Sequence, residues 1–296
     1  MINFSEITHW GADFFDKGFW QGAIVAIISF VLGSLVSFVS WIKRSGYFVI
    51  RFFNHYLFIE QFLTRKKIIL IWNDHDDKLS DYINKILKNR TSGLKYKTMK
   101  SPDEILRYPL NPKIIHMIIL IVSDVTKLSE KESRRVEIQD ALLKYVLEGG
   151  TLFGTHDLIY RRCRNKKLQD AYGCEITNFK RFPQPIKVAL NEKYKTHPLL
   201  KNLPQKFEVD DGELCWGHWG NDSEILIKTE NKVCNNHNKA CNYIPILVVK
   251  ELEHKGNLIW LNSADKRDRI ADSLTRPQDE IIQIFVNAIE YADERK

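Results

Sequence analysis

The chain has 296 residues, of which 44% are hydrophobic and 27% are charged. This balance is typical of a globular protein and excludes disorder as the explanation of any long segment. The net charge of +7 favours anionic partners such as phosphates or acidic lipid headgroups, but no motif interleaves basic with aromatic residues, so we expect no nucleic-acid binding.

The first residues are predicted to interact with the lipid bilayer. Residues 1–20 form an amphipathic segment typical of a membrane surface, and their acidic character excludes a secretory signal. A transmembrane helix is predicted over residues 21–42, because the twenty residues from Gly22 to Trp41 include no charged side chain and would span about 30 Å as a helix. Trp20 and Trp41 suit interface anchors. A buried core helix is the alternative interpretation.

The distribution of charge predicts the orientation of this helix. Lys43 and Arg44 follow it at once and further basic residues lie at 65–67, whereas the preceding segment has one lysine against three acidic residues. By the positive-inside rule, the protein is a single-pass protein of the inner (cytoplasmic) membrane, with its N-terminus outside and its C-terminal domain in the cytoplasm.

Small residues recur within the predicted span at Ser29, Gly33 and Ser37. Their spacing of four places them on one helix face and allows another helix to approach closely, which predicts a homo-oligomer. Residues 43–64 are predicted to form a juxtamembrane helix. The aromatic stretch 47–63 within it suits either an interfacial helix or a second membrane segment.

The remaining chain, residues 65–296, alternates strand and helix patterns. Its first half predicts strands at 67–72, 94–99, 114–122 and 151–154, with helices at 78–89 and 129–147. Such alternation is typical of a parallel sheet covered by helices on both faces. Asp74 and Asp124 follow the first and third of these strands.

The second half carries shorter strand patterns. We expect strands at 187–190, 206–209, 225–228, 244–249 and 258–261, and a closing amphipathic helix at 280–292. Residues 210–213 predict an acidic loop, and residues 231–243 predict an exposed insertion.

The turn after the strand at 151–154 combines the strongest chemical features. It places His156 and Asp157 at the end of a buried strand and at the start of a second helical pattern, the position at which open α/β sheets bind ligands. Three arginines follow within eight residues of His156 and suit an anionic small molecule, although a solvated helix face is the alternative. The predicted ligand-binding set is His156, Asp157, Tyr160, Arg161, Arg162, Arg164 and Asn165, with Asp74 and Asp124.

Five cysteines, all in the second half of the chain, do not form the pattern of a secreted disulfide framework. The main interpretation is that they are reduced and structurally incidental, so no cofactor is expected. Zinc is the alternative, because Cys/His spacings in this region supply enough ligands for a tetrahedral ion. That alternative site comprises Cys215, His218, Cys234, His237 and Cys241.

Several segments in order resemble the ThuA-like (trehalose-utilisation) family of the class I glutamine amidotransferase-like group. They are the YVLEGG helix end, the strand and His156 turn, the Thr-His-Pro-Leu segment at 196–199, the acidic Asp-Gly-Glu-Leu segment at 211–214 and the Gly-Asn-Leu-Ile-Trp strand at 256–260. The resemblance implies a flavodoxin-like α/β fold with a mostly parallel sheet and helices on both faces, here preceded by one transmembrane helix. If the domain is an enzyme, it also implies catalytic roles for His156, His197 and Glu213.

The chain departs from this family pattern at two chemically important positions. The turn carries His156 where the amidotransferases have a nucleophilic cysteine, and the late strand is followed by residues 262–265, Asn-Ser-Ala-Asp, where a Gly-His pair is usual. We therefore expect that neither a Cys-His pair nor a conventional nucleophile and base can be assembled.

Three functions fit these features. The first is a membrane-anchored sensor or effector whose cytoplasmic domain binds an anionic, nucleotide-derived small molecule and signals to self-associating transmembrane helices, as would suit bacterial anti-phage or stress defence. The second is a membrane-bound enzyme acting on a sugar or glycoside. The third is a catalytically degenerate scaffold. The missing catalytic partners favour the first.

Overall fold

The computed structural model describes residues 66–74, 85, 87–108, 110–122, 125–182, 185–209, 213–234, 241–252, 256–262 and 279–294. All of them belong to one compact unit, Tyr56–Lys296. The predictions made for residues 1–65, which include the amphipathic segment, the span, its self-association face and the juxtamembrane helix, lie outside the described residues. Within the described ranges, no helix has the length and apolar character needed to cross a bilayer.

A nine-stranded mixed sheet forms the centre of this unit, in the order β2-β1-β3-β4-β13-β12-β9-β6-β7. Its first five strands are parallel to one another. They are β1 (Lys67–Asn73), β2 (Leu94–Thr98), β3 (Ile115–Ile121), β4 (Thr151–Thr155) and β13 (Asn257–Leu261). Apolar runs that are buried along their whole length form β3, β4 and β13, as expected for strands covered on both faces.

The other half of the sheet is antiparallel. It consists of β12 (Pro245–Glu251), β9 (Glu224–Thr229), β6 (Ile186–Leu190) and β7 (Lys206–Val209). The predicted α/β class with a largely parallel sheet is confirmed, and all nine strands of the main sheet coincide with predicted ones to within two residues at either end.

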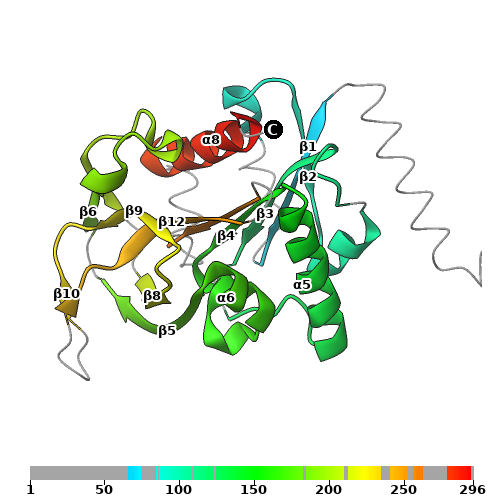
Figure 1. The fold of residues 1–296 in the computed structure, drawn as a ribbon, viewed down its shortest axis with the longest axis horizontal. Helices are drawn as coiled ribbons and strands as arrows, with labels where there is room; N and C mark the ends of the chain where they lie inside the picture. Colours follow the sequence, from blue (N-terminus) through cyan, green and yellow to red (C-terminus); the bar gives the residue numbers. More distant parts are fainter. Residues whose placement is uncertain are drawn as a thin grey trace, which may run out of the picture. The chain divides into compact units, whose positions relative to one another are not determined.

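Helices cover both faces of the sheet (Figure 1). One face packs against α5 (Glu132–Leu147) and α6 (Lys166–Tyr172), and the other packs against α8 (Asp279–Glu294). On the α8 face, Phe285 stacks on Phe153 of β4 with ring centroids 4.7 Å apart. Gly149, at φ 97°, ends α5 in the left-handed conformation that glycine adopts without strain.

Two smaller pairs of strands lie outside the main sheet. β5 (Cys174–Arg181) pairs antiparallel with β8 (Glu213–Trp219), and β10 (Val233–Cys234) pairs with β11 (Cys241–Asn242). The sequence analysis predicted neither pair. Among the described residues, short 3-10 helices are η1 (Pro102–Arg107), η2 (His156–Ile159), η3 (Arg161–Cys163), η4 (Glu192–Tyr194) and η5 (Pro198–Leu200).

The parallel arrangement determines where the site lies. Because β1, β3, β4 and β13 run in the same direction, their carboxyl ends meet at one edge of the sheet. The turn after β4 opens at this edge, between the ends of β3 and β13. This is the edge at which open α/β sheets bind ligands.

Candidate functional site

The turn after β4 is held in a strained conformation by its neighbours. His156 has φ 28°, a value that side chains other than glycine rarely adopt and that costs on the order of 1–3 kcal/mol. Thr155 Oγ1 accepts from Val122 N at 2.9 Å and donates to Val122 O at 3.2 Å, and Asp157 N donates to the same carbonyl at 3.1 Å. Trp260 Nε1 donates to His156 O at 3.1 Å. The ends of β3 and β13 therefore fix the turn.

The His156 side chain is completely buried and contacts a cysteine and a carboxylate. Its Nε2 lies 3.2 Å from Cys215 Sγ, and its Nδ1 lies 3.1 Å from Asp157 Oδ1. Cys215 and Asp157 are also buried, with 2% and 6% of their surface exposed. The expectation that no Cys-His pair can be assembled is therefore wrong. The cysteine comes from β8, 59 residues away in the chain, and not from the turn itself.

Burial and the neighbouring groups shift the protonation equilibria of this pair. Burial raises the pKa of the Cys215 thiol to about 11, although His156 opposes the shift. Burial lowers the pKa of His156, but the Cys215 sulfur and the Asp157 carboxylate more than offset it, so the net shift is upward. The upward shift of the Cys215 pKa favours the thiol, which is the less nucleophilic form.

Strand β8 brings a second carboxylate to the cluster. Glu213 and Cys215 are two residues apart on this strand and share a face, as the period of a strand requires. Glu213 is 9% exposed, and its carboxylate accepts a hydrogen bond from Arg181 Nε of β5 at 3.0 Å. Ligand atoms of His156, Glu213 and Cys215 all lie within 4.8 Å of one another, so these three residues can together hold a metal ion.

Asn262, just after β13, fixes the backbone of Cys215. Its Nδ2 donates to Cys215 O at 2.7 Å and to Pro245 O at 2.8 Å, and its Oδ1 accepts from Cys215 N at 3.0 Å. The asparagine is the first residue of the segment 262–265, which stands where the sequence analysis expected a Gly-His pair. Its role here is to position β8 at the turn.

The segment after Asp157 differs from the predicted helix. Two 3-10 turns, η2 and η3, precede α6, because Arg164 adopts a left-handed conformation at φ 56° that a continuous helix cannot contain. Asn165 is buried and donates to Leu158 O at 2.9 Å, and Gln169 donates to the carbonyls of Ile159 and Tyr160. These buried amides satisfy carbonyls that the turns leave without helical partners.

The three predicted arginines lie on the surface of this segment. Arg161, Arg162 and Arg164 are all exposed. In the part of the chain that the structure describes, none of them forms an ion pair. The Arg162 guanidinium lies 5.8 Å from the centre of the buried Tyr160 ring, a cation–π contact. The arginines therefore form an exposed cationic surface beside the buried cluster.

The other predicted site residues are placed differently. Asp74 follows β1 and its backbone N–H donates to Ile121 O at 3.1 Å, whereas Asp124 lies outside the described residues. His197 caps η5 by accepting from Leu199 N at 3.2 Å, and its ring lies 5.1 Å from that of Tyr291 on α8. His197 is not in the group formed by His156, Glu213 and Cys215.

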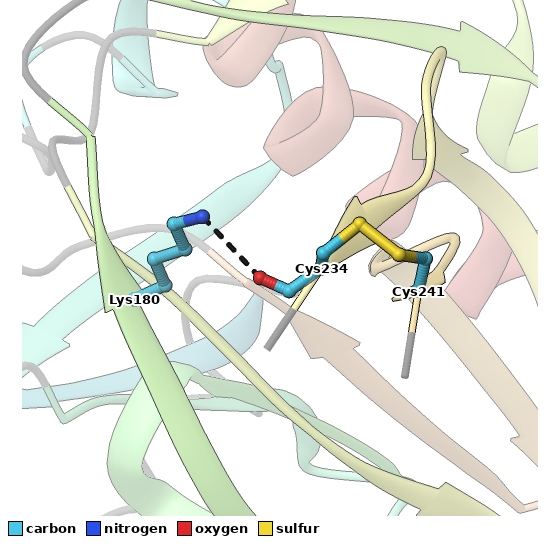
Figure 2. The surroundings of a disulfide bond; sticks show 3 residues. All are labelled: Lys180, Cys234 and Cys241. Carbon is cyan, nitrogen blue, oxygen red and sulfur yellow. Dashed lines mark hydrogen bonds between the residues drawn. A yellow bond between two sulfur atoms is a disulfide. The ribbon is translucent and has the colours of Figure 1, made fainter. Parts of the chain in front are cut away.

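The zinc site predicted from cysteine and histidine spacing is not assembled from the described members. Cys234 and Cys241 form a disulfide that joins β10 to β11, and Lys180 donates to Cys234 O (Figure 2). The expectation that all five cysteines are reduced is wrong for this pair, because the β10–β11 hairpin places the two residues opposite each other. His218, three residues after Cys215 on β8, is exposed while Cys215 is buried. His237 lies outside the described residues.

The sequence analysis missed the contribution of Cys215, Arg181 and Asn262 to this site. The sequence did contain one signal for Cys215, because side chains alternate between the two faces of a strand. If Glu213–Trp219 is a strand, Glu213 and Cys215 lie on one face and His218 lies on the other. No sequence pattern near His156 or Cys215 predicted the contact between these two residues.

Solved structures of other proteins share this fold. A protein of Bacteroides uniformis described as ThuA-like matches 77% of this chain and 91% of its own at 18% identity, with a TM-score of 0.52. A second ThuA-like protein, from Parabacteroides merdae, covers 77% of this chain and 90% of its own at 14% identity, with a TM-score of 0.51. A glutamine amidotransferase of Thermotoga maritima covers 77% and 98% at 11% identity, with a TM-score of 0.50.

Sequence comparison adds no closer assignment. No protein-family model matches the chain, and no curated protein does so either. The likeness therefore rests on three-dimensional structure. The described domain has the fold of the ThuA-like proteins and the class I glutamine amidotransferases, built on a mixed, largely parallel α/β sheet.

Proposed function

We propose that this protein is a membrane-anchored sensor or effector whose domain binds an anionic, nucleotide-derived small molecule at the carboxyl edge of its sheet. The observation that carries the proposal is the exposed surface formed by Arg161, Arg162 and Arg164 directly after the turn. Guanidinium groups at such a position suit phosphate oxygens, which they bind through charge-assisted hydrogen bonds.

The buried cluster supports binding in preference to catalysis. A nucleophilic thiol is usually partly exposed and has a lowered pKa, whereas Cys215 is buried with its pKa raised to about 11. The contact between Cys215 and His156 does favour one second candidate, a ThuA-like enzyme acting on a sugar or glycoside. In that case the imidazole would act as base and Asp157 would orient it.

In this proposal ligand binding is transmitted through the predicted span at residues 21–42 to other copies of the chain. Ser29, Gly33 and Ser37 would form the contact face. Replacing Gly33 with leucine should lower the yield of crosslinked oligomer in membranes. An unchanged yield would remove this face from the proposal.

The ligand itself can be identified from the full-length protein. Wild-type protein purified in detergent is denatured with acid, and the released small molecules are identified by mass spectrometry. We expect a phosphate-bearing molecule in stoichiometric amount, and little of it from a variant in which all three arginines are replaced by alanine. Arg107→Ala, which removes an exposed arginine from η1, serves as the control and should retain the molecule. Equal recovery from all three proteins would contradict the proposal.

The disulfide provides a test of the proposed topology. The structure joins Cys234 and Cys241 in a disulfide, whereas the reducing cytoplasm keeps most protein thiols reduced, so the redox state of this pair in living cells reports the compartment of the domain. Cells are treated with N-ethylmaleimide before lysis, and the alkylated positions are located by mass spectrometry. Alkylation of both residues supports a cytoplasmic domain. Protection of both until a reductant is added would place the domain outside the cytoplasm.

A further inference from the structure

We propose that His156, Glu213 and Cys215 bind a divalent transition-metal ion, and that zinc is the ion they fit best. This site differs from the zinc site suggested by cysteine and histidine spacing, with which it shares only Cys215. It is independent of the three arginines on which the proposed ligand binding rests.

The donor atoms are already at metal-binding separations. In a tetrahedral zinc site, bonds of about 2.1 Å to nitrogen and about 2.3 Å to sulfur place these two atoms roughly 3.5 Å apart. Cys215 Sγ and His156 Nε2 are 3.2 Å apart, and a Glu213 carboxylate oxygen lies with them inside 4.8 Å. Rotation of the His156 ring that turns the Nε2 lone pair towards Cys215 Sγ would admit an ion between the three donors.

The imidazole is oriented for this role by its other nitrogen. Nδ1 of His156 lies 3.1 Å from Asp157 Oδ1, so a proton on Nδ1 leaves the lone pair of Nε2 available to an ion. Cys215 Sγ lies 3.2 Å from Nε2 and 3.7 Å from Nδ1, beside the imidazole ring. A carboxylate that accepts from the second nitrogen of a histidine ligand is a recurrent feature of metal sites, because it selects the tautomer and raises the basicity of the ligand. Arg181 holds Glu213 in a comparable way by donating to Oε2 at 3.0 Å.

The backbone on both sides of the cluster is fixed. Asn262 binds both the N–H and the carbonyl of Cys215, and Trp260 donates to the carbonyl of His156. The three donors therefore come from two segments, the turn after β4 and strand β8. Residues at the end of β13 bind both segments and hold them at a fixed separation. Such preorganisation lowers the cost of bringing ligands together around an ion.

The donor set indicates the class of metal. One nitrogen, one sulfur and one carboxylate suit zinc or a similar transition ion, whereas magnesium and calcium prefer oxygen donors alone. Three protein ligands also leave one tetrahedral position for water or for an anionic group, which is the arrangement of exchangeable and catalytic zinc sites and not of closed structural ones.

The test measures metal in the full-length protein. Detergent-purified protein is stripped with a chelator, dialysed against zinc and analysed by mass spectrometry for bound metal. We expect one zinc per chain in the wild type and a loss of affinity of more than about 100-fold in Cys215→Ser, since disturbing even outer partners of a ligand costs 10–100-fold. Cys174→Ser is the matched control, because Cys174 is also a buried free cysteine and lies on the paired strand β5.

Two further variants keep the test decisive if Cys215→Ser fails to fold. Glu213→Gln should also lose the ion, and Asp157→Asn should weaken binding by about 10–100-fold while leaving it measurable. Cobalt provides an independent readout, because a thiolate ligand gives a sulfur-to-cobalt charge-transfer band that should be present in Cys174→Ser and absent from Cys215→Ser.

The following results would overturn the proposal. One is the absence of bound zinc and of the cobalt band in the wild type. Another is an equal zinc content in the wild type, Cys215→Ser and Glu213→Gln. A third is loss of zinc from the Cys234→Ser/Cys241→Ser variant alone, which would assign the ion to the other group of cysteines. Retention of zinc by that double variant supports the site described here.

Discussion

The segment from His156 to Asn165 contains two kinds of polar side chain that differ in their surroundings. His156, Asp157 and Asn165 are buried and bound to protein partners, whereas the arginines between them are exposed and form no ion pair in the described part of the chain. A buried polar group that loses its partner costs free energy, while an exposed charge gains a ligand without losing a protein contact. Buried groups should therefore determine folding, and the exposed ones should determine binding.

The largest effect on stability is expected at Asn262. Asn262→Ala removes three hydrogen bonds and leaves backbone groups of Cys215 and Pro245 buried without this partner, which should lower the free energy of unfolding by about 3 kcal/mol. Urea denaturation measures the change. Asn287→Ala is a matched control, because it also removes three hydrogen bonds, two to the carbonyls of Leu199 and Lys201 and one from Gln283 Nε2. Both variants should lose stability, but only Asn262→Ala should speed alkylation of Cys215. Equal alkylation rates would show that Asn262 does not position the cysteine.

A smaller loss is expected at Asn165. Asn165→Ala deprives the buried carbonyl of Leu158 of its donor and should cost about 1–2 kcal/mol. The neighbouring Lys166→Ala removes only a surface pair with Asp170 and should change stability by less than about 0.5 kcal/mol. Thermal unfolding of the two variants side by side makes the comparison. A loss at Lys166 as large as at Asn165 would contradict the assigned role of burial.

The sequence predicted the strands and the helix around this segment more accurately than it predicted the contacts of the segment's polar side chains. The apolar runs of β1, β3 and β4 and the glycine after α5 carry strong local signals, and these elements were predicted to within three residues at either end. Strands β5 and β8 were missed, because they pair with each other outside the main sheet and carry polar side chains on partly exposed faces.

The contacts of His156 could not be predicted for a different reason. The turn and its histidine follow from a strand that ends in Gly-Thr-His, but the partner Cys215 is 59 residues away on a strand with no clear pattern. Proximity of this kind depends on the packing of β8 against the turn. The exposure of the arginines, by contrast, agrees with the ordinary behaviour of a run of charges.

The smallest effect on stability is expected at the arginines themselves. Replacing Arg161, Arg162 and Arg164 together with alanine should change the free energy of unfolding by less than about 1 kcal/mol, since substitutions at exposed sites are usually near neutral and an exposed cation–π contact such as that of Arg162 contributes only about 0.5–1 kcal/mol. Denaturation of the triple variant and the wild type in parallel provides the measurement. A larger loss would mean that the guanidinium groups support the fold, as the Arg162 contact with Tyr160 would allow.

The central claim, that this edge of the domain binds an anionic molecule without converting it, is tested by calorimetry with product analysis on the same samples. The molecule recovered from wild-type protein is titrated into protein freed of it. Arg161→Ala or Arg164→Ala should weaken binding by roughly tenfold or more, the equivalent of one charge-assisted hydrogen bond of about 1.5–3 kcal/mol. The molecule should be recovered unchanged. Steady turnover that is abolished by His156→Ala or Glu213→Gln, with binding retained, would contradict the claim and identify the domain as an enzyme.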